Sequence, residues 1–169
     1  LVRENVLKNN PTLDISTPKR EKRLPKFLDP GEVTSLLEAP AKETWEGKRD
    51  RAILETLYSS GLRVSELVGL NGDDVDFFSG LLRVRGKGKK ERIVPIGEIA
   101  VRAIQNYLEH KMPRAGDGVA SKKPLFLNRS GGRLTDRSVR RMMIKYARRI
   151  ALQKEVSPHT LRHSFATHM

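Results

Sequence analysis

Two histidines and an arginine lie within five positions near the end of the sequence, in the stretch SPHTLRHSFATHM. On a helix beginning near Ser157-Pro158, at about 100° per residue, they share one face. That face holds His159, Arg162, His163 and Ala166. The opposite side holds Leu161, Phe165 and Met169. The spacing therefore predicts an organised polar face beside a face that packs on the core.

A metal site is the first chemistry to consider, because His159 and His163 have the i, i+4 spacing of a zinc pair. The glutamate of H-E-x-x-H is absent and a cationic arginine stands between them, which argues against zinc. The cluster Asp73-Asp74-Val75-Asp76 is interpreted as a turn. With no cysteine in the chain, a thiolate site and a disulfide framework are excluded. We expect no metal and no cofactor.

A second group of charged residues surrounds a predicted hairpin in LLRVRGKGKKERIVP, residues 81–95. By strand alternation, Leu82 and Val84 point one way, and Arg83 and Arg85 the other. Lys87 occupies a glycine-flanked turn from which it can reach into a groove. A phosphate-binding P-loop is rejected, because a strand rather than a helix follows the glycines.

A third group of cations lies on a helix predicted from Asp136 to Ile150. Opposite its apolar face, basic residues recur at intervals of four, four and three, with an acid only at its start. This stripe consists of Arg137, Arg141, Lys145 and Arg148. A cationic stripe of this kind favours contact with a phosphate backbone over an ordinary solvated face.

The charge of the whole chain supports a polyanionic partner. Lys and Arg total 33 against 20 acids, a net charge of +13 with a pI near 10.3. Nucleic acid is favoured over a membrane, since no apolar run approaches the roughly 18 residues of a span. Solubility alone remains the plain alternative. The N-terminal residues lack the apolar region of a secretion signal, so we expect a cytoplasmic protein.

Periodicity predicts the elements that position these residues. Helices are expected from Asp29-Pro30, from about Lys48 to Ser60, and from Arg63 to Leu70. Three short strands follow, then helices from Gly97, from Asp136 and from Ser157. The predicted fold is mainly α with a small three-stranded antiparallel sheet (α+β). Residues 1–25 read as the end of a preceding unit and a linker.

Two stretches joined by the hairpin carry a family resemblance. SSGLRVSELVGL, the RGKGKKER hairpin and SPHTLRHSFATHM together resemble the catalytic domain of tyrosine recombinases, most closely the Xer type. The resemblance covers nearly the whole chain. It implies the catalytic-domain fold over residues 26–169, incomplete at its C-terminal end, after the tail of a DNA-clamping domain in residues 1–25.

The resemblance also implies roles for individual residues. Arg63 and Arg162 match the two catalytic arginines, Lys87 the hairpin lysine and His159 the catalytic histidine. Glu66 matches the acid that buttresses the first arginine, and His163 has a supporting place. The family's nucleophilic tyrosine is expected downstream, and the three tyrosines present, Tyr58, Tyr107 and Tyr146, are predicted to be core residues.

The implied function is site-specific DNA recombination without metal, through a 3′-phosphotyrosyl intermediate, for chromosome or plasmid dimer resolution. Double-stranded DNA and a homo- or hetero-tetramer of recombinases are the implied partners. A phage, transposon or integron integrase and a non-catalytic DNA-binding module are the alternatives. The expected DNA-contact residues are Arg83, Arg85, Lys89, Lys90, Arg92, Arg137, Arg141, Lys145 and Arg148.

Overall fold

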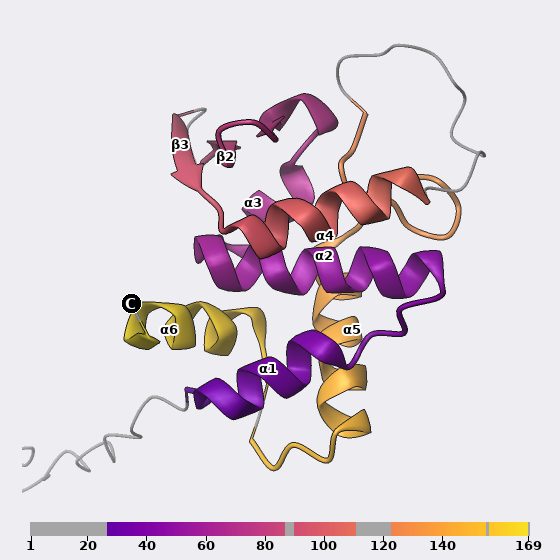
Figure 1. Cartoon of the computed structure of the whole chain (residues 1–169), viewed down its shortest axis with the longest axis vertical. Helices are drawn as coiled ribbons and strands as arrows, with labels where there is room; N and C mark the ends of the chain where they lie inside the picture. The colour runs from indigo at the N-terminus through magenta and orange to yellow at the C-terminus, as the bar shows by residue number, and fades with distance from the viewer. Residues whose placement is uncertain (1–26, 87–89, 111–122, 155, 169) are drawn as a thin grey trace, which may run out of the picture.

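The computed structural model describes residues 27–86, 90–110, 123–154 and 156–168. Within them, helix α2 (Trp45–Ser60) runs through the middle of the molecule. Helix α4 (Glu98–Glu109) lies alongside it, and α6 (Pro158–His168) packs on it too (Figure 1). This mainly helical architecture with one small sheet is the predicted fold class. No helix in the described ranges is long and apolar enough to cross a membrane.

Hydrogen-bonding side chains set the starts of three helices. Before α1 (Pro30–Glu38), the Asp29 and Glu32 carboxylates each accept the other residue's backbone N–H at 2.9 Å, forming a capping box. Thr44 Oγ1 accepts the Gly47 N–H at 3.1 Å, so α2 begins at Trp45, three residues before the predicted Lys48. Thr135 caps α5 (Asp136–Arg149), which begins at the predicted Asp136.

The turn between α2 and the next helix sets the place of Arg63. Gly61 ends α2 with φ of 58°, and its N–H donates to Leu57 O at 3.0 Å. Helix α3 (Val64–Gly69) then begins with Arg63 as its N-cap. Arg63 is therefore fixed at a helix end, two residues after a turn that is anchored to the central helix.

The sheet follows a 3-10 turn (Gly72–Asp74) and has the order β1–β2–β3, all antiparallel: β1 (Val75–Asp76), β2 (Leu81–Arg85) and β3 (Glu91–Pro95). Leu82 and Val84 of β2 are fully buried, whereas Arg83 and Arg85 are exposed, which confirms the predicted alternation. In the β2–β3 register, Val84 lies opposite Arg92, so Arg92 belongs to the inner face.

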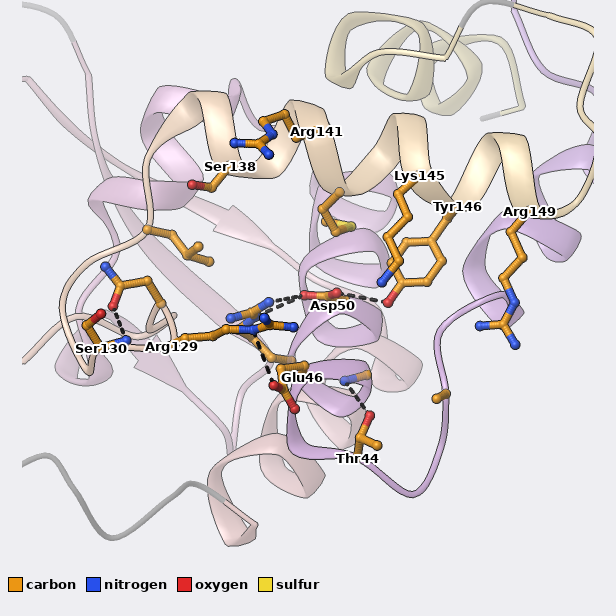
Figure 2. A pocket seen from close by; sticks show the side chains of 16 residues that line it. Thr44, Glu46, Asp50, Arg129, Ser130, Ser138, Arg141, Lys145, Tyr146 and Arg149 are labelled. Atoms are coloured by element: carbon orange, nitrogen blue, oxygen red, sulfur yellow. Dashed lines mark hydrogen bonds and ion pairs between the residues drawn. The ribbon is translucent and has the colours of Figure 1, made fainter.

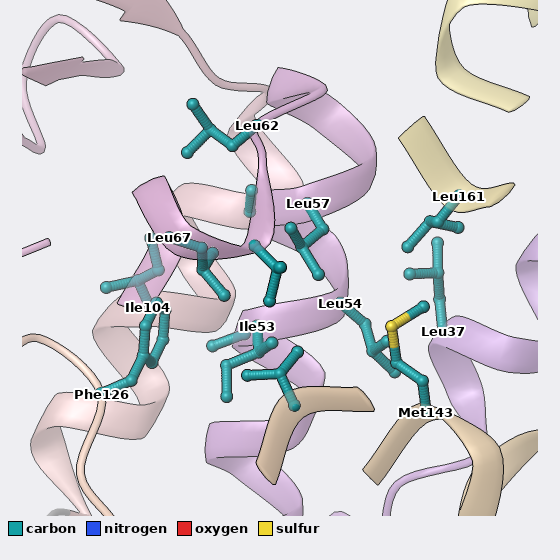
Figure 3. Packing of buried hydrophobic residues seen from close by; sticks show 14 of the residues in the cluster. Leu37, Ile53, Leu54, Leu57, Leu62, Leu67, Ile104, Phe126, Met143 and Leu161 are labelled. Carbon is teal, nitrogen blue, oxygen red and sulfur yellow. The ribbon is translucent and has the colours of Figure 1, made fainter. Parts of the chain in front are cut away.

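A mostly aliphatic core is built around α2. Figure 3 shows its residues Ile53, Leu54 and Leu57 among buried side chains from the other helices. The fully buried members include Leu67 of α3 and Ile104 of α4. An aromatic group, Trp45, Tyr107 and Phe126, stacks at one end of this core.

The buried face of α6 differs from the prediction. Thr160, Leu161 and Ser164 are buried, and Ser164 Oγ accepts the Leu28 N–H at 2.9 Å. Phe165, expected beside Leu161, is only half-buried and lies on the polar side of the helix. Met169 lies outside the described residues. The hydroxyls of Thr160 and Ser164 have hydrogen-bond partners within the fold, so these two polar residues can be buried.

Candidate active site

The predicted Arg63, His159 and Arg162 come together in one cavity of about 270 Å³, together with Arg140. We call it the arginine pocket. Arg63 enters it from the N-terminus of α3, His159 and Arg162 from α6, and Arg140 from α5. The fold therefore brings residues about 100 positions apart in the sequence to one site. They come from the two motifs on which the family resemblance rests.

A neighbouring cavity of about 320 Å³ shares His159 and Arg162 with the arginine pocket. We call it the α6 cleft. It is also lined by His163, Ala166 and Arg92, so the predicted polar face of α6 forms one wall. The His159 and His163 rings stack with centroids 6.4 Å apart. Among the described residues, no group of three or more His, Asp or Glu side chains could hold a metal.

Arg162 has an unsatisfied nitrogen. Its Nη1 atom is buried and, within the described part of the chain, has no hydrogen-bond partner. A guanidinium nitrogen withdrawn from water without an acceptor is unfavourable, and an oxyanion in the adjoining cavity would supply the acceptor. Arg162 lines both cavities, so this nitrogen is a potential donor to an anion bound beside it.

Glu66 contacts both the backbone and the side chain of Arg63. Its Oε2 accepts the Arg63 backbone N–H at 2.9 Å, and its Oε1 lies 3.3 Å from Arg63 Nη1. The Glu66 side chain is only 6% exposed, whereas that of Arg63 is 66% exposed. The Glu66 carboxylate is therefore buried below the Arg63 guanidinium. Only one side-chain nitrogen of Arg63 contacts it, so the other guanidinium donors of Arg63 stay free to face the pocket.

Arg92 is a site residue that sequence reasoning assigned to a different role. It was expected to contact DNA, but Nη1 and Nη2 donate to Oε1 and Oε2 of Glu66, both at 2.9 Å. Burial would raise the pKa of Glu66, but hydrogen bonds from Arg92 and Arg63 together with the charge of Arg92 hold that pKa at about 2. The strand register that puts Arg92 opposite the buried Val84 appears only in the folded sheet, so the sequence did not distinguish Arg92 from the other cations of the hairpin.

Arg140 and Asp136 were also missed. Both line the arginine pocket from one flank of α5, whereas the predicted stripe lies on the outer face of that helix. Arg140 is one helical turn beyond Asp136, and this i, i+4 relation was visible in the sequence. It was missed because the predicted DNA contacts on this helix were restricted to the stripe of Arg137, Arg141, Lys145 and Arg148.

Besides Arg92, two more of the expected DNA-contact residues form ion pairs with acids. Arg83 Nε and Arg85 Nη1 contact the two oxygens of the buried Asp74 at 3.2 and 2.7 Å. Arg85 also reaches Glu91 at 3.0 Å. The other described members are exposed, namely Lys90, Arg137, Arg141, Lys145 and Arg148. Lys87 and Lys89 lie outside the described residues.

A larger cavity of about 790 Å³ follows the opposite flank of α5, and we call it the α5 groove. Figure 2 shows Arg141, Lys145 and Arg149 along its α5 side, with Arg129 across from them. The charged residues at the bottom of the groove are paired with each other. Arg49 Nε and Nη2 donate to Asp50 Oδ1 at 2.9 and 2.7 Å. The α5 side of the groove is thus cationic, whereas Arg129 on the opposite side is paired with Glu46 at 3.5 Å.

The three tyrosines of the chain are all among the described residues, and none lines the arginine pocket. Tyr107 and Tyr146 are buried, as predicted. The Tyr146 hydroxyl donates to Asp50 Oδ2 at 2.9 Å, and burial together with the Asp50 charge raises the Tyr146 pKa. Tyr58 is only half-buried, and its hydroxyl lies 3.0 Å from His168 Nδ1.

Known proteins match this chain over most of its length. A sequence profile of the phage integrase family matches residues 26–169. Tyrosine recombinase XerC of Pelobacter propionicus is 56% identical, over 100% of this chain and 54% of that protein. Tyrosine recombinase XerC of Thermodesulfovibrio yellowstonii is 47% identical, over 100% of this chain and 57% of that protein. The chain spans about half the length of the curated relatives that it matches.

Solved structures agree with this assignment. The crystal structure of XerA recombinase superposes with a TM-score of 0.74 at 32% identity, covering 86% of this chain and 50% of that one. XerH recombinase bound to its difH substrate shares the fold, with a TM-score of 0.70, at 24% identity and over 89% and 44% of the two chains. With the profile match over residues 26–169, the chain belongs to the phage integrase family.

Proposed function

We propose that this chain provides the phosphate-binding part of a site-specific DNA recombinase that cleaves and rejoins strands without metal. The observation that carries the proposal is the convergence of Arg63, His159 and Arg162 on one cavity, with Arg162 Nη1 buried and without a partner in the described residues. Two guanidinium groups supply fixed forks of donors for the non-bridging oxygens of a phosphate. A module that only binds DNA needs no such convergence.

The chemistry proceeds through a pentacoordinate phosphorus. A tyrosine oxygen attacks the phosphorus, its proton passes to His159, and the bond from phosphorus to the 5′ oxygen breaks. Lys87 donates the proton that the 5′ oxygen takes up on leaving. Arg63 and Arg162 stabilise the charge on the non-bridging oxygens. Because Tyr58, Tyr107 and Tyr146 lie away from the pocket, the attacking tyrosine comes from outside these 169 residues.

The stripe on α5 supports the contact with duplex DNA. A helix that carries a scissile-phosphate pocket on one flank and exposed cations on its outer face can hold the backbone on either side of the cleavage point. Arg140 of the pocket and Arg137 of the stripe lie on adjoining parts of this helix. We propose these two arginines as neighbours along one phosphate track.

The relatives support a proposal for the wider biological role. The resemblance to XerC proteins at 44–56% identity favours resolution of chromosome or plasmid dimers over integration of a mobile element. In such a reaction four recombinase subunits act on two DNA duplexes in the cytoplasm. The target sequence and the partner subunit are properties of the whole recombinase.

The test uses a hybrid recombinase, in which this chain replaces the matching half of the Pelobacter propionicus XerC protein. On a nicked DNA substrate whose cleaved strand diffuses away, the hybrid should form a covalent protein–DNA adduct in the presence of EDTA. Arg63→Gln and Arg162→Gln should each slow adduct formation by about 100-fold or more. Arg102→Gln, an exposed change on α4, is the matched control and should not slow it.

Absence of an adduct with the unmodified hybrid, or an adduct that forms only with a divalent metal, would contradict the proposed function. Equal rates for the Arg162→Gln and Arg102→Gln variants would contradict the role of the pocket.

A further inference from the structure

The acceptor sites of Glu66 are completely occupied. A carboxylate offers about four lone-pair positions, and Glu66 receives four donors: the Arg63 N–H, Arg63 Nη1, and both terminal nitrogens of Arg92. The two Arg92 contacts are 2.9 Å long, whereas the Arg63 side-chain contact is 3.3 Å. Arg92 is therefore the principal ion-pair partner, and Arg63 is held loosely.

We propose that Arg92 is a positioning residue that saturates Glu66 and thereby keeps the Arg63 guanidinium available for the scissile phosphate. This inference rests on the proposed function, because it assumes that Arg63 binds that phosphate. It assigns Arg92 to the active site through Glu66, and not to the DNA surface.

Competition between two arginines for one buried acid is the physical basis. The Glu66 side chain is 6% exposed, so water cannot easily replace a missing donor. Without Arg92, each carboxylate oxygen would lose one donor. Arg63, three residues away at the start of the same helix, is the cation in reach and could close a bidentate pair. That pair would draw its guanidinium away from the arginine pocket.

The geometry requires an arginine at position 92. Its planar fork reaches both Glu66 oxygens at once, which a lysine ammonium cannot do. The inner-face position of Arg92, opposite Val84, directs the side chain toward α3. Arg92 also lines the α6 cleft with His159 and Arg162, so the Glu66–Arg92 pair links α3 to β3 directly beside the catalytic groups.

The test measures anion binding at Arg63 in the 169-residue chain itself. Inorganic phosphate is titrated against isotope-labelled protein, and the side-chain Nε–Hε signal of Arg63 is followed by NMR. Arg92→Gln should weaken phosphate binding about tenfold, the scale of one lost charge-assisted hydrogen bond. Arg92→Lys should show an intermediate loss of about threefold, because one contact remains.

A double variant separates positioning from a structural defect. In Arg92→Gln/Glu66→Gln the charge that would capture Arg63 is gone, so phosphate affinity should recover to within about threefold of the unmodified chain. The matched control is Arg133→Gln. Arg133 donates to the carbonyls of Val68 and Leu70, so this change loosens the far end of α3 without touching Glu66. It should leave phosphate affinity unchanged.

The outcomes distinguish this inference from the proposed function. If the unmodified chain binds no phosphate at Arg63, both fail. If it binds, and the folded Arg92→Gln variant binds equally well, the inference alone fails. A double variant that binds no better than Arg92→Gln would contradict it too. Should Arg92→Gln not fold, Arg92→Lys and the double variant decide the question by the same comparison.

Discussion

Glu66 and Arg162 shape the pocket in opposite ways at the residue scale. Glu66 has four donors around its carboxylate and is fully satisfied, whereas Arg162 has a buried nitrogen without an acceptor among the described residues. The first arrangement keeps a negative charge buried and immobile. The second leaves positive charge uncompensated, so that an incoming phosphate gains more than it would at the surface.

The ion pairs of Glu66 make stability depend on pH. The pKa of Glu66 is about 2, against an ordinary value of 4.5. A lowered pKa contributes stability that is present above pH 4.5 and lost as pH falls toward 2, about 3 kcal/mol in total. We therefore expect urea unfolding to show that the unmodified chain loses stability relative to Glu66→Gln as the pH falls from 5 to 2.5. The free-energy difference between the two proteins should change by roughly 3 kcal/mol.

Other carboxylates titrate in both proteins, so the difference between them isolates Glu66. A stability difference that stays constant over this pH range would contradict the paired state of Glu66. A change of the opposite sign, with the unmodified chain gaining relative stability in acid, would contradict it as well.

Which residues meet could be predicted from the sequence where a motif fixes their spacing. Arg63 and Glu66 are three residues apart, and so are His159 and Arg162. Helix geometry alone therefore brings the two members of each pair close together. The Glu66–Arg92 pair depends on the pairing of β2 with β3 and on how that hairpin lies against α3. In the sequence, Arg92 looks like any other cation of the hairpin.

At the scale of elements, the site forms only if α6 packs correctly against the core. The backbone N–H of Leu28, just before α1, donates to Ser164 Oγ at 2.9 Å, and Leu161 is fully buried in the core. On the other side, the Phe165 ring packs against Gly61 at the end of α2. These contacts hold His159 and Arg162 at a fixed distance from the turn that leads to Arg63.

Gly61 is expected to be sensitive to substitution for two reasons. Its φ of 58° is unfavourable for a residue with a side chain, and an added Cβ would lie 2.8 Å from Phe165 Cδ1. Gly61→Ala should destabilise the chain by at least about 1 kcal/mol in urea unfolding. Gly69→Ala, at the end of α3 where an added Cβ meets nothing within 4 Å, should be neutral or stabilising. Similar losses for both alanines would contradict this account of the turn.

The elements themselves were largely predictable. Capping residues and apolar periodicity gave the helices and the three-stranded meander, with α2 extended by one turn because Thr44 caps it. The buried face of α6 was not predictable. Ser164 is buried because its hydroxyl meets a backbone group 136 positions away, and residue types alone do not reveal such a partner.

At the scale of the whole molecule, the chain has a net charge of +13, but its cations differ in whether an acid is paired with them. Arg83, Arg85 and Arg92 are balanced by buried acids, whereas the cations on the outer face of α5 remain exposed. The arginine pocket lies on one flank of this helix and the α5 groove on the other. Among the described residues, α5 thus carries exposed positive charge between these two cavities, the arrangement expected for a protein that holds a duplex by its backbone.

The central claim is that Arg63 and Arg162 act on the negative charge of one scissile phosphate. It is tested most directly by replacing a non-bridging oxygen of that phosphate with a methyl group, which removes the charge. In the hybrid recombinase, Arg162→Gln should slow cleavage of ordinary DNA by about 100-fold or more, but that of the methylphosphonate by only about tenfold or less. Equal defects on the two substrates would contradict the claim.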